Sequence, residues 1–165
     1  MLNIPPEILI LTVAAAPIVE LRGSIPLAVG VFNMTICWAA ILSVIGNLIP
    51  AFLIYWLGQL WIDWNERHQG VLHRLTQGVI RRSRKVFNDG KYEKYGLLAL
   101  SLFVAIPLPM TGVWTGTVAA FLFGVSLKRA LPFIALGAII AAVIVSLVTT
   151  GALSFLDFLF ISPLS

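Results

Sequence analysis

Charged residues are scarce in this sequence of 165 residues. They make up 11% of it, apolar residues make up 59%, and the mean hydropathy is +0.99. An ordinary soluble domain carries charge on about a quarter of its residues. The scarcity therefore excludes a soluble domain and predicts an all-α integral membrane protein, a single unit over residues 1–165 that is too short for two domains.

Cysteine is almost absent, since Cys37 stands alone, and this excludes an intramolecular disulfide and a thiolate metal site. The residues before Glu7 lack the positive charge of a cleavable signal peptide, so we expect the first apolar segment to remain in the protein. P-loop, zinc and nucleophile-elbow motifs are missing as well. We therefore expect no enzyme activity, no cofactor and no metal, and we do not expect ATP-driven transport by this chain alone.

Positive charge is concentrated in one segment, because eight of the eleven lysines and arginines lie between Arg67 and Lys94. Such a segment lies in water, and its position beside membrane segments argues against a nucleic-acid partner. Apolar residues recur around it at intervals of three, four or seven. These apolar residues are Trp61, Trp64, Val71, Leu75 and Val79. Their spacing predicts an amphipathic helix in the connector, residues 63–95, that lies on anionic lipid headgroups.

Two breaks interrupt the apolar sequence, the polar segment Glu20–Pro26 and the proline-rich segment Ile106–Gly112. An arm of roughly 12 helical residues rises about 18 Å, whereas the hydrocarbon core of a bilayer is about 30 Å thick. The arms beside the breaks are therefore predicted to enter the membrane and stop near its middle: Ile8–Val19, Leu27–Phe32, Leu97–Ala105 and Val113–Val125.

The positions of the charges predict how the segments cross the membrane. Four full spans would place Lys128 and Arg129 on the side opposite the basic connector, whereas a hairpin over residues 96–127 places ten of the eleven cations on one side. We therefore predict two opposed re-entrant hairpins, each followed by a spanning helix (Thr35–Ile62 and Ala130–Thr149). This is an inverted repeat of residues 1–62 and 96–165, as in alternating-access transporters. The connector would be cytoplasmic and both termini outside, in the bacterial inner membrane.

Glu20 and Arg22 carry charge into an apolar region, where ionised side chains normally face a protein interior or a water-filled cavity. Gly23 and Pro26 predict an irregular turn that lets both charged side chains line one site. The arginine is suited to bind a phosphate or carboxylate, and the glutamate to exchange protons. The alternative is that the pair neutralises itself or caps the hairpin turn.

The second break combines prolines with small polar residues. Pro107 and Pro109 remove amide donors and leave carbonyl groups that need partners. The following half-helix would direct its positive N-terminal end to the membrane midplane, where an anion is favoured, although the Gly and Thr residues there also suit helix packing. Asn47 either donates into the same cavity or bonds a neighbouring helix. The predicted site for substrate and ion comprises Glu20, Arg22, Ser24, Pro26, Asn47, Pro107, Pro109, Thr111, Gly112 and Thr115.

The segment Glu20–Pro26, together with Ile106–Gly116, resembles the paired motifs of the small multidrug export protein family, which is related to the DedA/VTT superfamily. The resemblance covers nearly the whole chain. It implies a transporter fold with two opposed hairpins and, by analogy with the DedA branch, movement of a polyprenyl phosphate or a similar anionic lipid. DedA proteins typically carry arginines in the second hairpin, whereas Val104–Thr111 contains none.

Two classes of function are compatible with these features. The first is an ion-coupled secondary transporter or flippase for an anionic lipid or another small amphiphile, with Glu20 as the proton carrier, or a small-molecule and drug exporter. The second is a non-transporting membrane scaffold that binds a partner through the basic connector. An ionisable pair at a backbone break favours transport, because a scaffold gains little from it. Membrane lipids are expected partners, and hairpins that need cover favour a homodimer.

Overall fold

The computed structural model describes residues 4–67, 90–108 and 111–161. Helices account for most of these residues, and the described part contains no strand, which confirms the all-α prediction. The predicted connector helix falls largely outside the described residues, as does Pro109. The helices are α1 (Pro6–Ala15), α2 (Glu20–Gly30), α3 (Ile36–Arg67), α5 (Gly90–Ala105), α6 (Val113–Leu122) and α7 (Leu127–Ile161).

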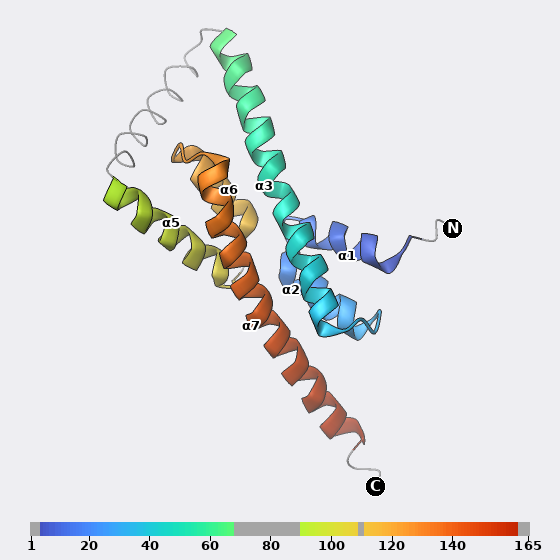
Figure 1. Cartoon of the computed structure of the whole chain (residues 1–165). Helices are drawn as coiled ribbons and strands as arrows, with labels where there is room; N and C mark the ends of the chain where they lie inside the picture. The colour runs from blue at the N-terminus through green and yellow to red at the C-terminus, as the bar shows by residue number, and fades with distance from the viewer. Residues whose placement is uncertain (1–3, 68–89, 109–110, 162–165) are drawn as a thin grey trace.

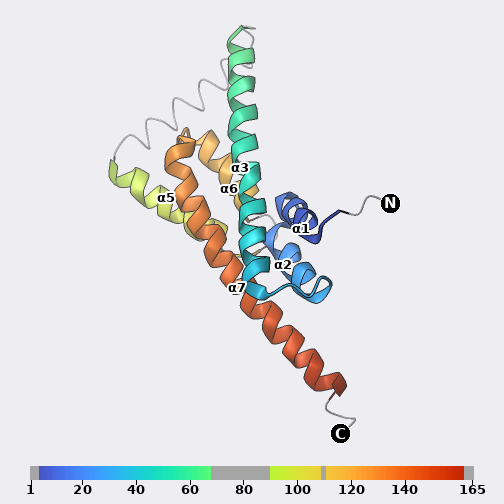
Figure 2. The same ribbon diagram turned by 45° about the vertical axis from the view of Figure 1, so that its right-hand side comes forward.

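Two helices are long and apolar enough to cross a membrane. The apolar part of α3 is Ile36–Trp61 (26 residues) and that of α7 is Leu127–Phe155 (29 residues). At 1.5 Å per residue these segments rise about 39 and 44 Å, more than the hydrocarbon core of about 30 Å. Figures 1 and 2 show α3 and α7 side by side, running in opposite directions. Both predicted spanning helices are confirmed as long apolar helices, and each extends further than predicted.

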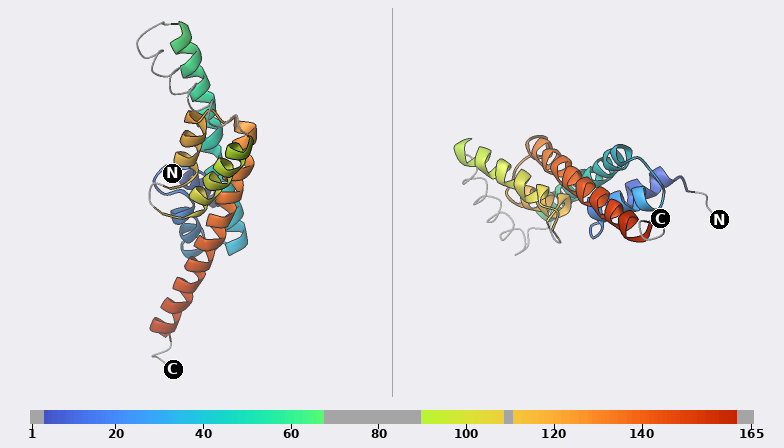
Figure 3. Two further views of the ribbon diagram at one scale, coloured as in Figure 1. Left: turned by 90° about the vertical axis from the view of Figure 1, so that its left-hand side faces the viewer. Right: turned by 90° about the horizontal axis from the view of Figure 1, so that it is seen from below.

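The other helices are shorter, and they form two pairs. Helices α1, α2 and α6 have 10 or 11 residues, and the apolar part of α5 is Tyr95–Ala105. Ten helical residues rise only about 15 Å. The views in Figures 1 and 3 place α1 and α2 on one flank of the long helices and α5 and α6 on the other. α1 contacts α3 and α5 contacts α7, while α2 and α6 each contact both long helices.

The first break does not lie where the sequence predicted it. Glu20–Pro26 is helical, and the chain leaves the helix earlier, at 16–19. Pro17 is the physical reason, because the residue before a proline disfavours helical geometry and Ala16 is extended (φ −72°, ψ 137°). Pro26 is accommodated inside α2, as Pro50 and Pro132 are inside α3 and α7. Prolines are tolerated in membrane helices, so Pro26 was a poor marker of the break.

The second break agrees with the prediction, since α5 ends at Ala105 and α6 begins at Val113. α6 then ends in a Schellman motif. Gly124 has a positive φ of 73°, and the N–H groups of Gly124 and Val125 donate to the carbonyls of Phe121 and Ala120 at 2.9 and 3.0 Å. This turn joins α6 to the start of α7.

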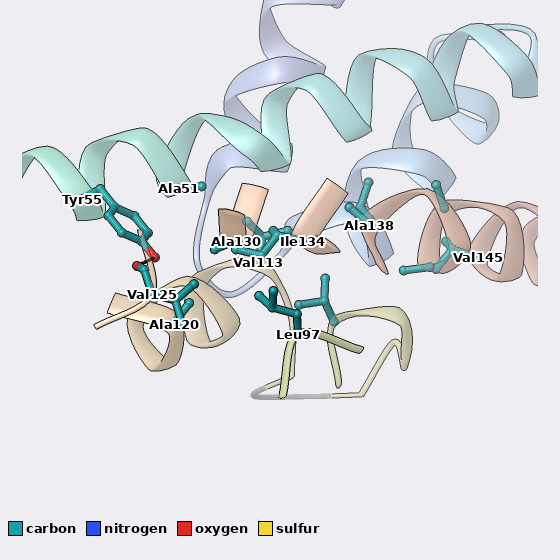
Figure 4. Close-up of a cluster of buried hydrophobic side chains, with 14 of the residues drawn as sticks. Ala51, Tyr55, Leu97, Val113, Ala120, Val125, Ala130, Ile134, Ala138 and Val145 are labelled. Carbon is teal, nitrogen blue, oxygen red and sulfur yellow. Dashed lines mark hydrogen bonds between the residues drawn. The ribbon is translucent and has the colours of Figure 1, made fainter. Parts of the chain in front are cut away.

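One cluster of buried apolar side chains connects both halves of the chain (Figure 4). It combines residues of α2 and α3 with residues of α5, α6 and α7, and Ile25, Ile134 and Val113 in it are fully buried. Small residues are frequent there. In a bilayer, where lipid is as apolar as leucine, small residues stabilise a helix bundle through close van der Waals packing. The small residues of this cluster are Ala51, Ala120, Ala130, Ala138, Ala141 and Ala142.

Two glycines mark the closest helix crossings. A Cβ on Gly46 of α3 would stand 2.5 Å from the carbonyl oxygen of Leu11 and 2.9 Å from the Cβ of Ala14, both in α1. A Cβ on Gly137 of α7 would stand 2.5 Å from the carbonyl oxygen of Ser101 and 2.8 Å from the Cβ of Val104, both in α5. The long helices therefore need a glycine where α1 crosses α3 and where α5 crosses α7.

Tyr55 joins α3 to the turn after α6. Its hydroxyl donates to the carbonyl oxygen of Val125 at 2.8 Å (Figure 4). Its ring meets Phe121 edge to face, with the ring centroids 5.5 Å apart. Tyr55→Phe keeps the ring and removes the hydroxyl, so we expect it to destabilise the protein by about 1 kcal/mol in a detergent unfolding titration. Tyr95→Phe, at a side chain that is 71% exposed, is the matched control. Equal stability of the two variants would contradict this role of Tyr55.

Candidate functional site

Glu20 is the first residue of α2 and lies almost fully buried, 5% exposed, with a positive φ of 48°. Its carboxylate lies at the start of α6, where the main-chain N–H of Trp114, the second residue of that helix, stabilises the negative charge. A helix N-terminus has N–H groups without intrahelical partners and a positive dipole end, so a carboxylate there is stabilised. Glu20 therefore caps α6 from the other half of the chain.

Gly112 makes room for this contact. It precedes α6, and a Cβ built on it would stand 2.6 Å from Oε1 and 2.7 Å from Cδ of Glu20, with Oε2 closer still. The backbone of Gly112 is extended, a conformation open to any residue, so glycine is required here for space. The prediction grouped Glu20 and Gly112 in one site, and the structure brings them into contact.

Arg22 faces the same carboxylate. Its Nη2 atom lies 3.9 Å from Glu20 Oε2, which is an ion pair but longer than a hydrogen bond. The arginine side chain is 24% exposed and the glutamate side chain 7%. Two residues apart on a regular helix, the pair would point away from each other. The left-handed backbone at Glu20 provides the deviation that the sequence attributed to Gly23 and Pro26.

Trp114 makes a second connection between the breaks. Its indole Nε1 donates to the carbonyl oxygen of Ala15, the last residue of α1, at 3.0 Å. Its main-chain N–H meets Glu20 at the same time. The beginning of α6 is thus held at both sides of the first break. This contact could not be predicted, because no pattern in the sequence identifies an indole partner 99 residues away.

The second break satisfies its own backbone. The Thr111 hydroxyl lies 2.7 Å from the carbonyl oxygen of Ile106 and accepts the Leu108 N–H at 3.1 Å, and that N–H also lies 2.9 Å from the Ile106 carbonyl oxygen. The prediction that these carbonyls need partners is answered by Thr111. Thr115 makes a weaker 3.4 Å contact with the Gly112 carbonyl oxygen. Both threonines therefore have local partners, while Pro107 lies in the turn as a residue that cannot donate.

The remaining predicted residues lie along α2 and α3. Ser24 is fully buried and donates to the hydroxyl of Ser43 at 2.8 Å. Asn47 is 1% exposed, and within the described part of the chain its Oδ1 has no hydrogen-bond partner. Pro26 is exposed on α2. Ser43 was missed from the sequence, although a serine within an apolar spanning helix is itself a sign of a helix contact.

A comparison with known protein families places these elements in context. The family described as "Putative small multi-drug export protein" matches residues 20–144, from the capping glutamate to the middle of α7. The chain belongs to this family. The family resemblance of the two motifs is thereby confirmed, whereas the relation to the DedA/VTT superfamily stays a prediction. No curated protein and no solved structure matches the chain.

Membership in this family agrees with a membrane protein of the transporter kind, and the two long apolar helices agree with it as well. A groove of about 530 Å³ lies between the first part of α3 and the second part of α7. Its walls are apolar apart from a few small polar residues, and they include neither Glu20 nor Arg22. The groove is therefore suited to hydrocarbon, and Glu20 and Arg22 lie outside it. Its lining includes Ile36, Cys37, Val44, Ile139, Ser146 and Thr150.

Proposed function

We propose that the protein is a proton-coupled secondary transporter for an amphiphile with an anionic headgroup, such as a polyprenyl phosphate. One observation carries the proposal: a buried carboxylate, beside an arginine, occupies the N-terminus of a short helix across two backbone breaks. The α6 N-terminus and Arg22 form an anion site in which Glu20 is the resident anion. Protonation of Glu20 would release this site for a phosphate, and loss of the proton would expel the phosphate.

The proposed architecture is a pair of opposed re-entrant hairpins, α1–α2 and α5–α6, each followed by its spanning helix. The helix lengths support it, since α1, α2 and α6 rise about half the thickness of the hydrocarbon core. Matching contacts in the two halves support an inverted repeat. Gly46 and Gly137 each lie ten residues after the first residue of their helix (36 to 46 and 127 to 137). Gly46 contacts α1 and Gly137 contacts α5, which are the first helices of the two hairpins.

Irregular backbone at membrane depth is tolerated only inside protein or beside a water-filled cavity. Both breaks carry exposed apolar residues, with Ile18 at 86% and Leu108 at 56% exposure. A second copy of the chain would cover these turns, so we include a homodimer in the proposal. The bacterial inner membrane, a cytoplasmic connector and outside termini follow from the charge distribution. The apolar groove between α3 and α7 would take the hydrocarbon tail.

The test is translocation of labelled polyprenyl phosphate by purified protein in liposomes with an imposed pH gradient. We expect Glu20→Gln to abolish gradient-dependent movement, because it cannot exchange a proton. We expect Arg22→Ala to reduce movement about tenfold to a hundredfold, because it removes charge-assisted hydrogen bonds to the headgroup. Glu7→Gln is the matched control, since Glu7 is an exposed acid in the first turn of α1.

The family description favours a second candidate, the export of small-molecule drugs. The same liposomes, loaded with a hydrophobic cationic dye, separate the two substrates. Dye movement without movement of polyprenyl phosphate would indicate that the substrate is a small-molecule drug and not the lipid. Correctly oriented protein that moves neither probe under a pH gradient would overturn transport and leave the membrane scaffold.

A further inference from the structure

A row of buried polar side chains, Ser24, Ser43 and Asn47, lies along the contact between α2 and α3. Ser24 and Ser43 are fully buried and share a 2.8 Å hydrogen bond. One turn further along α3, Asn47 is 1% exposed, and its Oδ1 has no partner among the described residues. Buried polar atoms are almost always hydrogen-bonded, so an amide oxygen left over at such a place requires a donor.

The register of the two helices places Asn47 beside Glu20. Ser24 pairs with Ser43, and Ala28 shares a packed cluster with Ala39, so α2 and α3 run antiparallel. Glu20 precedes Ser24 by four residues, and Asn47 follows Ser43 by four. Residues four apart lie on the same face of a helix. Counted from the Ser24–Ser43 pair, Glu20 and Asn47 therefore stand at the same level of the contact between the two helices.

Only a donor can satisfy Asn47 Oδ1, because an amide oxygen is purely an acceptor. The ionised Glu20 carboxylate has no proton to give, and it is held instead by the Trp114 N–H and Arg22. A protonated carboxyl group has one O–H donor and loses most of its attraction to the helix N-terminus. It then needs an acceptor within reach.

We propose that Asn47 Oδ1 accepts the hydrogen bond of protonated Glu20, so that the carboxyl group has two positions, one on α6 and one on α3. The proton adds to the carboxylate, the carboxyl group leaves the N-terminus of α6, and its O–H group donates to Asn47 Oδ1. Asn47 is thus a positioning residue for the proton-loaded state. This inference rests on the proposed function, because release of the α6 N-terminus is what admits the anionic headgroup.

Arg22 is the charged group that faces this site from α2 itself. α6 has no ionisable residue. α1 contributes Glu7, which lies in its first turn at the far end from the break. The titratable residues in the apolar part of α3, Ile36–Trp61, are Tyr55 and Cys37. Tyr55 is hydrogen-bonded to the Val125 carbonyl oxygen, and Cys37 is exposed. α7 begins with Lys128 and Arg129, which are exposed.

The test is infrared difference spectroscopy of the full-length protein in lipid during a pH titration without substrate. Glu20→Gln identifies the carbonyl stretch of the protonated Glu20 carboxyl group by removing it. In Asn47→Leu, we expect this band to move to higher frequency, because the carboxyl group loses its acceptor. We also expect the pH at which it appears to fall by about one unit, a tenfold weaker proton affinity.

Thr117→Val is the matched control, because Thr117 is also fully buried, has an Oγ1 atom without a partner in the described part of the chain, and belongs to α6 instead of α2 or α3. It should leave the band and its midpoint unchanged. Asn47→Gln keeps an amide oxygen and should restore much of the wild-type band. If Asn47→Leu does not fold, Asn47→Ala provides the same comparison.

An unchanged band in Asn47→Leu or Asn47→Ala would overturn the inference, as would the absence of any protonated Glu20 band in the wild type. Because the titration contains no substrate, it also separates the two proposals. A shifted band in a protein that moves neither lipid nor dye would keep Asn47 as the partner of Glu20 and reject transport. Transport with an unshifted band would keep the transporter and reject Asn47.

Discussion

Replacing Gly112 with alanine is expected to reduce transport about tenfold to a hundredfold while the protein still folds. The added Cβ would occupy the space of the Glu20 carboxylate, 2.6 Å from Oε1 and 2.7 Å from Cδ. The group that must move is the end of a flexible side chain, so the fold can absorb the change. The contact between Glu20 and the Trp114 N–H, in contrast, would be lost. Gradient-dependent flux in liposomes, measured beside a thermal unfolding curve, checks both halves of this prediction.

Two further variants make the test specific. Gly30→Ala adds a Cβ where nothing lies within 4 Å, and it should leave flux unchanged. In the thermal unfolding curve, the double variant Gly112→Ala with Glu20→Gln should be no less stable than the less stable of the two single variants, because both changes act on one contact. Additive losses would mean that Gly112 acts by another route, and wild-type flux in Gly112→Ala would show that the cap on α6 is not part of the mechanism.

The second large effect concerns stability. Gly46→Ala and Gly137→Ala should each destabilise the protein by about 3 kcal/mol, at the upper end of the usual range for overpacking. The added Cβ would meet the backbone carbonyl of Leu11 or of Ser101 at 2.5 Å, and a backbone atom cannot move without shifting its whole helix. The midpoint of unfolding in a mixed-detergent titration measures the loss.

Gly151→Ala is the matched control for these two changes. Gly151 lies in α7, and a Cβ there meets nothing within 4 Å. Alanine favours a helix over glycine by about 1 kcal/mol, so this variant should be as stable as the wild type or slightly more so. If Gly46→Ala or Gly137→Ala behaves like Gly151→Ala, the close crossing of α1 on α3 or of α5 on α7 is wrong.

The long helices and the second break could be predicted from the sequence because their causes are local. Apolar runs longer than the bilayer is thick give α3 and α7, and the residues after Ala105 end α5 where predicted. The first break shows the limit of such reasoning. Polar residues drew attention to Glu20–Pro26, whereas the helix ends one turn earlier because of Pro17. A proline acts on the residue before it, and composition alone does not show which proline ends a helix.

The candidate site divides in the same way. Glu20 and Arg22 are visible in the sequence because charge within apolar sequence requires a reason. Their partners are not visible, because contacts between residues about ninety positions apart depend on how the helices fold back on one another. Only the tertiary structure decided that Gly112 yields its space to the Glu20 carboxylate, that Trp114 bonds Ala15, and that Thr111 is engaged within its own turn.

By itself the sequence determined an all-α membrane protein with two long apolar helices and a charge pair within apolar sequence, since hydropathy and helix length are properties of the chain alone. It also carried the motifs of the family to which the chain belongs. The tertiary structure decided which helix N-terminus receives the carboxylate and which polar atoms are left without partners. Those outcomes depend on how helices far apart in the sequence pack together, for example where α1 and α5 cross the long helices at Gly46 and Gly137.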